Sequence, residues 1–467
     1  KGTEAAIAGR AEQGFRTYLT NYPEGRYANS ADGLIRKSVW LQGDRERLGA
    51  IYSEMLDGNT ELDEQTAALI EEVDDKYLIN QFDNIGQVAP TNAMLLATNN
   101  LLRMRKWEGS DGSDELLTTS ELNAQAAVFE NHPELYSFLK ATHAYYVADN
   151  PKAVLQLVPD AARADSYAPL DFSRQYLRGL ALHALNDRNE EGFWLELMQG
   201  ADGIYQRPAI ELALARVYET KGMLHKAFAD NSPITDLYIR RVLLGQSAGP
   251  DILKAQARNA QVEESERSFA LFTALIKQLQ HGEYSGFITD YALIDAKETS
   301  DEESGLWSIY GSSDAPFHVF TAGQTTDEYA CPDLSRTVQA LATNPRAVSA
   351  RLCLGEFYRL NGFDYFSFAG RSNFAEARGG YVLGSSDYYP GDPTPRQGFY
   401  TAIMNDRRAS KNDRAYAMYR AIRCYAPSGN NTCGGESVEV DQRKAWFQRL
   451  KRDYPRSKWA QELEYYW

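Results

Sequence analysis

The 467-residue sequence has no cysteine before position 331, only six histidines, and no apolar run near the roughly 18 residues of a membrane-spanning helix. It also lacks a P-loop, a G-x-G-x-x-G turn, an H-E-x-x-H motif and any facing pair of histidines. We therefore expect no transmembrane segment in this chain, no cofactor and no metal site. The histidines are better explained by helix caps and packing; they are His132, His143, His183, His225, His281 and His318.

Positive charge is scarce relative to negative charge. Lys and Arg number 49 against 64 Asp and Glu, so the net charge is -15. An acidic surface repels phosphate backbones and anionic lipids, which excludes nucleic acid as a partner and disfavours electrostatic membrane docking. The hydrophobic share of 43% and the charged share of 24% are ordinary for globular proteins, so we expect a packed core.

The sequence opens on Lys1-Gly2-Thr3 without a signal-peptide pattern. A targeting peptide already removed, or a lipid anchor upstream, is compatible with this start. The length fits about three domains of roughly 150 residues or one elongated repeat array.

Four cysteines cluster late in the chain, at separations of 22, 71 and 9 positions. This spacing lacks the paired C-x2-4-C units of zinc sites. Three disulfide connectivities exist for four cysteines, and local geometry favours Cys331–Cys353 and Cys424–Cys433. The first pair would join two helices predicted at 332–342 and 346–361; the second would close a loop rich in Pro, Gly and Asn. Disulfides would indicate an oxidising compartment, whereas four reduced, buried cysteines would indicate the cytosol.

Helical periodicity dominates the sequence, and four helical segments share a similar spacing of small and large residues. Each places a small residue before a large one, followed by a Gly, Asn or later Ala; the segments contain Ala141, Gly179, Ala215 and Gly355. The segment that matches this spacing best is Leu354-Gly355-x-x-Tyr358-x-x-x-Gly362. This spacing resembles the tetratricopeptide repeat, a helix-turn-helix unit of about 34 residues. Ordinary helical hairpins without repeat ancestry are the alternative.

A sharper signature stands near both ends of the chain. The first copy contains Tyr22-Pro23-Glu-Gly25-Arg26-Tyr27-Ala28, and the second contains Tyr454-Pro455-Arg-Ser457-Lys458-Trp459-Ala460. We expect a helix to end at each Tyr-Pro, the Gly or Ser to begin the next helix, and its aromatic residue to pack back across the joint. This joint resembles those of tetratricopeptide proteins of the bacterial envelope, such as outer-membrane-assembly and cell-division-coordination lipoproteins. The resemblance implies a scaffold that binds proteins and carries no catalytic residues.

The predicted fold is all-α: a solenoid of antiparallel, tetratricopeptide-like helix pairs with long irregular loops in the C-terminal third. Its predicted parts are N-terminal helical repeats over 1–120, central repeats over 121–296, an acidic excursion over 297–330 and disulfide-containing repeats over 331–467. Within the excursion, the acidic residues are expected to form a solvated loop rather than a cation site; they are Glu298, Asp301, Glu302 and Glu303. Residues 317–320 could form a short strand.

Gly245-Gln-Ser247-Ala-Gly249 matches G-x-S-x-G, the nucleophile elbow of serine hydrolases, which needs a strand before it and a helix after it. Residues 238–244 could pass for that strand, and His281 or His318 would be the bases. The helical surroundings favour instead a helix capped by Gly245 and a new helix near Pro250. We therefore expect no catalytic residues and no enzyme.

The stretch 380–400 is the most distinctive non-helical segment, and its prolines and glycines predict an irregular loop. Its aromatic and acidic residues could form a binding face, or they could pack on neighbouring helices. The candidate binding residues are Tyr381, Tyr388, Tyr389, Asp392, Phe399 and Tyr400.

The leading hypothesis is a non-enzymatic scaffold, periplasmic or at the cell surface and outer-membrane-associated, that binds an envelope protein or peptide. One alternative is a glycan-active (α/α) toroid with two loop carboxylates as acid and base. The 29 Tyr and 7 Trp would suit sugar stacking in such a toroid. The other is a glycan-binding surface lipoprotein without catalysis.

Overall fold

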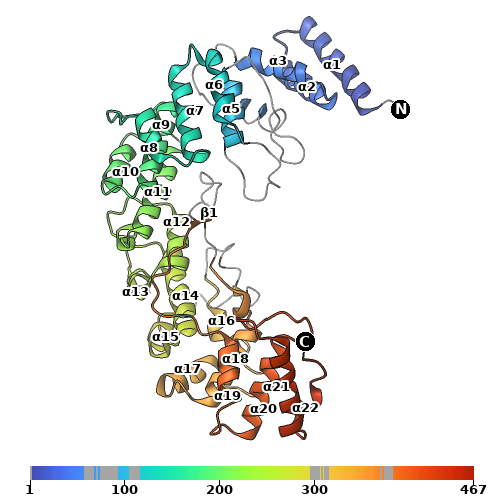
Figure 1. Ribbon diagram of the computed structural model, residues 1–467, viewed down its shortest axis with the longest axis vertical. Coiled ribbons are helices and arrows are strands. Elements are labelled where there is room, and N and C mark those ends of the chain that lie inside the picture. Colours follow the sequence, from blue (N-terminus) through green and yellow to red (C-terminus); the bar gives the residue numbers. More distant parts are fainter. Residues whose placement is uncertain are drawn as a thin grey trace. The chain divides into compact units, whose positions relative to one another are not determined.

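A computed structural model describes most of the chain. The described residues are 3–56, 93–104, 116–203, 205–294, 315–368 and 382–466, with short stretches at 68–69, 72–73, 305–306, 309 and 371–372. Among them the regular structure is helical, apart from two paired two-residue strands, β1 (Arg371–Ser372) and β2 (Val382–Leu383) (Figure 1). The all-α prediction is confirmed.

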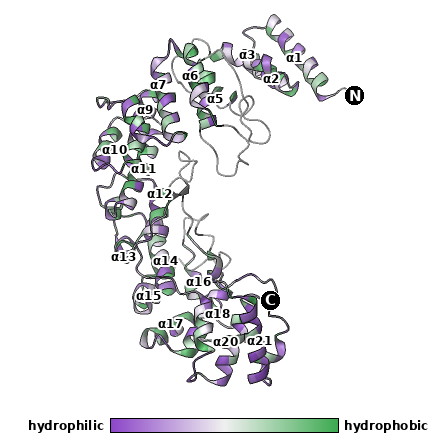
Figure 2. Cartoon of the chain, in the orientation of Figure 1, coloured by the Kyte–Doolittle hydropathy of each residue, from purple (hydrophilic) through white to green (hydrophobic). Residues whose placement is uncertain are grey.

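The described residues divide at Val217–Tyr218 into two compact units, with Ser372 grouped with the first. This division falls inside the predicted central segment, and the four-part division made from the sequence stays a prediction. Most helices of both units carry apolar and polar residues together, as amphipathic helices must to bury one face (Figure 2).

The first unit buries apolar side chains between helices that follow one another in sequence, for example α1 on α2 and α7 on α8. One of its cores joins Phe138, Val154 and Leu180. Its elements are α1 (Glu4–Asn21), α2 (Ala28–Leu41), α3 (Arg45–Leu56), α5 (Ala93–Met104), α6 (Thr119–Ala124), η2 (Ala126–Phe129), α7 (Pro133–Tyr146), α8 (Pro151–Leu157), α9 (Pro169–Ala184), α10 (Glu190–Met198) and α11 (Gln206–Thr220), the last of which crosses the division.

The second unit has a cluster of buried side chains around Tyr416, Met418 and Leu450. Here too, successive helices pack, as α13 on α14 and α19 on α20. Its elements are η3 (Leu224–Phe228), α12 (Leu237–Val242), the π-helical turn η4 (Leu243–Ser247), α13 (Pro250–Arg258), α14 (Glu264–His281), α15 (Tyr284–Tyr291), α16 (His318–Thr321), α17 (Leu334–Thr343), α18 (Val348–Leu360), η7 (Phe363–Tyr365), α19 (Arg396–Ile403), α20 (Lys411–Arg423), α21 (Val440–Asp453) and α22 (Lys458–Glu462).

Several helices end in the same left-handed turn. After α9, Asn186 has φ 52°, and the amide of Asp187 donates to the carbonyl of Leu182 at 2.9 Å. The equivalent bond and a left-handed glycine follow α11 and α14, at Gly222 and Gly282. This is the Schellman arrangement, which satisfies carbonyls that the helix leaves free. Left-handed residues also follow α2, α7 and α18, at Gly43, Asp149 and Gly362.

The small residues predicted to let helices approach do so at two positions. A Cβ added at Gly179 of α9 would overlap the Trp194 ring on α10, and one at Gly355 of α18 would lie 3.0 Å from the Tyr400 hydroxyl on α19. Only glycine fits such close approaches without displacing the neighbouring ring.

The two Tyr-Pro joints differ in detail. At both, the helix ends just before the tyrosine, with Tyr22 and Tyr454 as C-caps. In the second joint Ser457 caps α22 as predicted, and Trp459 is buried. In the first joint α2 begins at Ala28, not at Gly25, and Tyr27 is 59% exposed. The expected packing of the aromatic residue is therefore wrong for Tyr27. The rings that Trp459 contacts, Tyr416 and Tyr419, belong to α20, so its packing across the joint stays a prediction.

Two short strands suggested by the sequence are wrong. Residues 318–321 form the short helix α16, in which Val319 and Phe320 are buried. The ring of Phe320 contacts the ring of Phe272 on α14. The segment before Ser247 is likewise helical, as α12 and η4. The acidic residues 298–304 lie outside the described residues.

Both disulfides favoured by the sequence are present. Cys331 is bonded to Cys353 and Cys424 to Cys433, with Cα separations of 5.5 and 5.2 Å. Such bonds persist in oxidising, extracytoplasmic compartments. Within the described part of the chain, no helix is long and apolar enough to cross a membrane.

Candidate functional site

The loop after β2, residues 384–395, lies as a strap on the second unit and is fixed by a buried carboxylate. Glu219, at the end of α11, is fully buried and accepts from the backbone amides of Gly384 at 3.1 Å and Ser386 at 3.0 Å. Ser247 donates to the same carboxylate at 2.6 Å, and Tyr388 donates to the Glu219 carbonyl. A buried charge needs such a set of donors, so the strap and Glu219 stabilise each other.

A buried lysine holds the other side of the strap. Lys277 of α14 donates to the carbonyls of Gln246 at 3.0 Å and Ala248 at 3.3 Å, and pairs with Asp387 at 3.3 Å. Burial lowers the pKa of Lys277, and the Asp387 carboxylate opposes that change. Tyr389 donates to Glu283 at 3.1 Å, and burial raises its pKa. These groups are occupied in attaching the strap.

The structure does not bring the predicted binding residues together on one face. Tyr389, Phe399 and Tyr400 are buried, whereas Tyr388 is 42% exposed and Asp392 is also exposed. Tyr381 lies outside the described residues. The buried members pack on neighbouring helices, as the second interpretation of this stretch expected.

The G-x-S-x-G match does not form a nucleophile elbow. Ser247 is fully buried at the end of a π-helical turn, and its hydroxyl donates to Glu219 rather than to a histidine. Gly245 lies inside that turn instead of capping a helix, and α13 begins at Pro250 as predicted. His281 instead stacks on Tyr389, and burial lowers its pKa.

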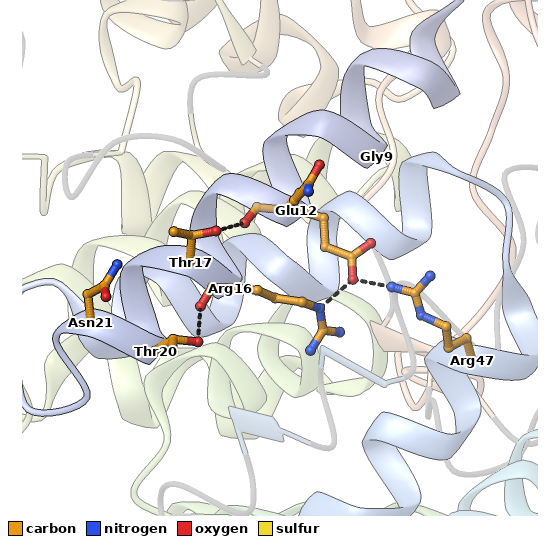
Figure 3. Close-up of a pocket in the computed structure, with 8 residues that line it drawn as sticks. Gly9, Glu12, Arg16, Thr17, Thr20, Asn21 and Arg47 are labelled. Atoms are coloured by element: carbon orange, nitrogen blue, oxygen red, sulfur yellow. Dashed lines mark hydrogen bonds and ion pairs between the residues drawn. The ribbon is translucent and has the colours of Figure 1, made fainter.

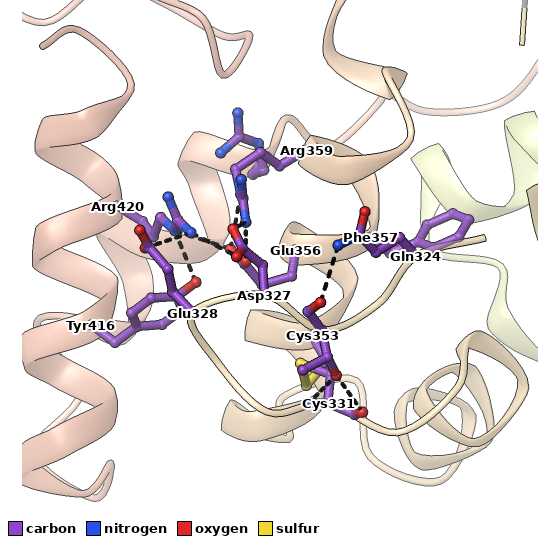
Figure 4. A network of polar contacts seen from close by, with 12 residues as sticks. Gln324, Asp327, Glu328, Cys331, Cys353, Glu356, Phe357, Arg359, Tyr416 and Arg420 are labelled. Atoms are coloured by element: carbon purple, nitrogen blue, oxygen red, sulfur yellow. Dashed lines mark hydrogen bonds and ion pairs between the residues drawn. A yellow bond between two sulfur atoms is a disulfide. The ribbon is translucent and has the colours of Figure 1, made fainter. Parts of the chain in front are cut away.

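A second group of charges lies beside the Cys331–Cys353 disulfide (Figure 4). Glu356 of α18 is fully buried; Arg359 reaches it at 2.7 Å and Arg420 at 3.0 Å. Burial would raise the pKa of Glu356, but the arginines outweigh burial and lower it.

The remaining carboxylates of this cluster are paired too. Arg420 also reaches Glu328 at 2.8 Å, and Arg359 reaches Asp327 at 2.7 Å. Every carboxylate in the cluster faces an arginine, so none is placed as a free base. The cluster joins α18, α20 and the loop before α17, and its role is structural.

A polar groove lies in the first unit, on α1 and α3 (Figure 3). Its cavity is about 500 Å³ and is lined by Gly9, Glu12, Gln13, Arg16, Thr17, Thr20, Asn21 and Arg47. Seven of these residues lie on one face of α1, because they recur every three or four positions. Apart from Gly9, the lining residues have polar or charged side chains.

Glu12 organises this groove. It is only 5% exposed, and one of its carboxylate oxygens accepts from Arg16 at 2.7 Å and from Arg47, while Gln42 donates to the other at 2.9 Å. Burial would raise the pKa of Glu12, but these hydrogen bonds lower it to about 2. Glu12 is therefore ionised and holds two guanidinium groups at one side of the groove.

The groove offers both donors and acceptors to a ligand. Arg16 uses its Nε for Glu12, which leaves its terminal nitrogens directed away from that carboxylate. The hydroxyls of Thr17 and Thr20 donate to backbone carbonyls at 2.8 and 2.9 Å, so their oxygens remain able to accept. Arg47 also lies 3.8 Å from Asp44, so two arginines meet two carboxylates here. The groove therefore offers an acidic or carboxylate-bearing segment guanidinium donors rather than a net positive charge.

Sequence reasoning missed this groove. The Glu12–Arg16 pair is visible as an i,i+4 spacing, but such pairs are common on solvated helix faces. Arg47 and Gln42 lie 35 and 30 positions further along the chain, and nothing local indicates that they converge on Glu12.

Among the described residues, no group of three or more His, Cys, Asp or Glu side chains could hold a metal ion. Another cavity, of about 580 Å³ beside α9 and α10, mixes arginines with carboxylates and holds one aromatic residue, Phe193. It offers no aromatic-walled cleft for a sugar ring. The glycan hypotheses therefore stay predictions.

No protein-family model, curated protein or solved structure matches the chain.

Proposed function

We propose that the chain is an extracytoplasmic helical scaffold that binds a protein or peptide partner, with the α1–α3 groove as a contact site. The observation that carries this proposal is the buried Glu12, which fixes Arg16 and Arg47 at the edge of an open polar cavity. These contacts join α1 to Gln42 and to α3, and they also hold guanidinium donors in place for a ligand.

The size and chemistry of the groove favour a short peptide segment. A cavity of about 500 Å³ lies within the usual range for ligand sites, roughly 300–1,000 Å³. Arginine forks bind carboxylates in a bidentate manner, and threonine and amide side chains match the donors and acceptors of a peptide backbone. We propose an acidic side chain opposite Arg16 and Arg47, with backbone along Thr17 and Thr20.

Repetition of one helix joint supports a tetratricopeptide-like solenoid of antiparallel helix pairs. The left-handed turns after α9 and α11 lie 36 positions apart, at Asn186 and Gly222, close to the length of a tetratricopeptide unit. Arrays of this kind present extended surfaces to partner proteins. With the Tyr-Pro joints, this favours kinship with tetratricopeptide lipoproteins of the bacterial envelope.

The disulfides support the location. Two of them in one chain fit the periplasm or cell surface better than the cytosol. Association with the outer membrane, through a lipid anchor upstream of Lys1, is part of the proposal.

Peptide-library selection on the immobilised full chain tests this function. We expect enriched peptides to share an acidic position, and their affinity, measured by fluorescence polarisation, to fall about tenfold in Arg47→Gln because a charge-assisted hydrogen bond is lost. Arg10→Gln is the matched control: it removes the same charge from an exposed position on α1 outside the groove. The proposal fails if no peptide is enriched, or if the two variants bind equally well.

A further inference from the structure

A separate cavity with excess positive charge lies in the second unit, where the start of α18 meets the end of α19. It measures about 320 Å³. Its lining residues are Arg346, Val348, Arg351, Ala402, Ile403, Asn405, Asp406 and Arg408. Three guanidinium groups thus surround one carboxylate, in a chain whose net charge is -15.

Two of the three arginines face the cavity without a carboxylate partner. Arg408 pairs with Asp406 at 3.2 Å, which neutralises that pair. Among the described residues, Arg346 and Arg351 form no ion pair. Other buried arginines of the same unit are paired with acids, as Arg396 is with Asp364 at 2.6 Å and Arg420 is with Glu356 at 3.0 Å. The cavity therefore holds two uncompensated cations.

Arg351 is held in place rather than free to extend into solvent. It is half-buried, and its guanidinium lies over the Phe399 ring with 5.3 Å between the guanidinium carbon and the ring centroid. Burial lowers the pKa of Arg351, the nearby Tyr284 opposes that change, and the charge of Arg346 adds to it. A half-buried guanidinium beside a second cation is unfavourable unless an anion joins them.

The rest of the lining complements the arginines. Val348 and Ile403 give an apolar floor that reduces competition from water. The first turn of the 13-residue α18 has no side-chain cap at Ala347, so its free amides add to the positive potential.

We propose that this cavity binds an oxyanion, a carboxylate or phosphate group, between Arg346 and Arg351. Both groups present paired oxygens to a guanidinium fork. The site is separate from the α1–α3 groove, and it goes beyond the proposed partner binding.

Isothermal titration calorimetry on the full chain tests the site, with sodium phosphate and sodium acetate as probes at constant ionic strength. We expect saturable binding of at least one anion in the millimolar range, where the binding free energy is about -4 kcal/mol. Arg351→Gln should weaken binding at least tenfold, and Arg346→Gln, an exposed position that the fold tolerates, should also weaken it. Binding of phosphate alone, acetate alone or both identifies the source of the oxyanion.

Two controls separate this site from other cations. Arg336→Gln removes an arginine of α17 that is 78% exposed and outside the cavity, and Arg47→Gln removes one from the α1–α3 groove. Both should leave the anion affinity unchanged. Absence of saturable binding by either probe overturns the proposal, as does a loss in Arg336→Gln or Arg47→Gln equal to that in Arg351→Gln. Neither result bears on peptide binding by the first unit.

Discussion

Replacing Arg420 by methionine tests whether the charge cluster of Figure 4 holds the second unit together. Arg420 is 4% exposed and lies 3.0 Å from Glu356 and 2.8 Å from Glu328. It also donates to the Tyr416 hydroxyl at 2.8 Å. Methionine keeps much of the side-chain length but removes every one of these interactions.

The expected loss is about 3 kcal/mol. Removing one partner of a buried ion pair costs roughly 3–5 kcal/mol, because the other charge stays buried without compensation. The lower end applies, since Arg359 still reaches Glu356 at 2.7 Å and Glu328 is partly exposed to water. Arg452→Met is the control: this exposed arginine pairs with Asp453 at 2.7 Å, and surface pairs of this kind contribute little to stability.

Urea unfolding followed by tryptophan fluorescence measures the effect, because Trp459 packs on Tyr416 with ring centroids 4.5 Å apart. The double variant Arg420→Met/Glu356→Gln should regain about 1 kcal/mol, since it removes a buried carboxylate that has lost one of its two arginines, while Arg359 keeps Asp327 as a partner. The reasoning is refuted if Arg420→Met costs no more than Arg452→Met, or if the double variant is less stable than Arg420→Met alone.

Three further predictions follow from the packing, the disulfides and the groove. Gly179→Ala should destabilise the first unit by about 1–3 kcal/mol through its clash with Trp194, whereas Gly192→Ala, where an added Cβ meets nothing, should stabilise α10 by up to about 1 kcal/mol; thermal unfolding that ranks the two variants the other way contradicts the close approach. Cys424→Ala/Cys433→Ala should destabilise the second unit by about 2–3 kcal/mol, because without the disulfide the nine-position loop between the cysteines gains conformational freedom in the unfolded chain. Urea unfolding measures this loss, and equal stability of the variant and the unsubstituted protein would count against it. Because the folded pKa of Glu12 is lowered to about 2 from 4.5, its stabilising contribution is complete above pH 4.5 and is lost as pH falls toward 2; circular dichroism against pH should show Glu12→Gln lacking that part of the acid transition, and an unchanged transition would disprove it.

Local features of the fold were predictable from sequence. The helices expected at 332–342 and 346–361 are α17 and α18, which begin at Leu334 and Val348. The Thr343-Asn-Pro345 turn separates them as breaker residues should, and Cys331 and Cys353 then meet. Helix periodicity, turn residues and short-range disulfides all depend on neighbours in sequence, so the sequence displays them directly.

Short apolar runs were less informative. Residues 317–320 and 238–244 have the composition of strands, and both are helical because their apolar side chains pack against other helices of the second unit. Tertiary packing overrides local preference in runs of this length. Length alone does not separate a buried strand from a buried helical turn.

The charged sites were beyond sequence reasoning. Glu12 and Arg47 lie 35 residues apart in the sequence. Arg351 of α18 and Arg408, which follows α19, line one cavity although they are also far apart in the sequence. In sequence each of these residues looks like any other on a solvated helix face. Their significance comes from burial and from the balance of charges around them, which only the packed structure shows.

The strap has a consequence for how the chain is made. Glu219 receives the amide of Gly384 from 165 residues further on, and Lys277 pairs with Asp387, 110 residues further on. At about 5–20 residues per second, a ribosome needs roughly 10–30 s to synthesise the intervening chain after Glu219 has emerged. During that delay Glu219 lacks the backbone amides of the strap, and Lys277 lacks the Asp387 carboxylate. Completion of this unit is therefore tied to late stages of synthesis.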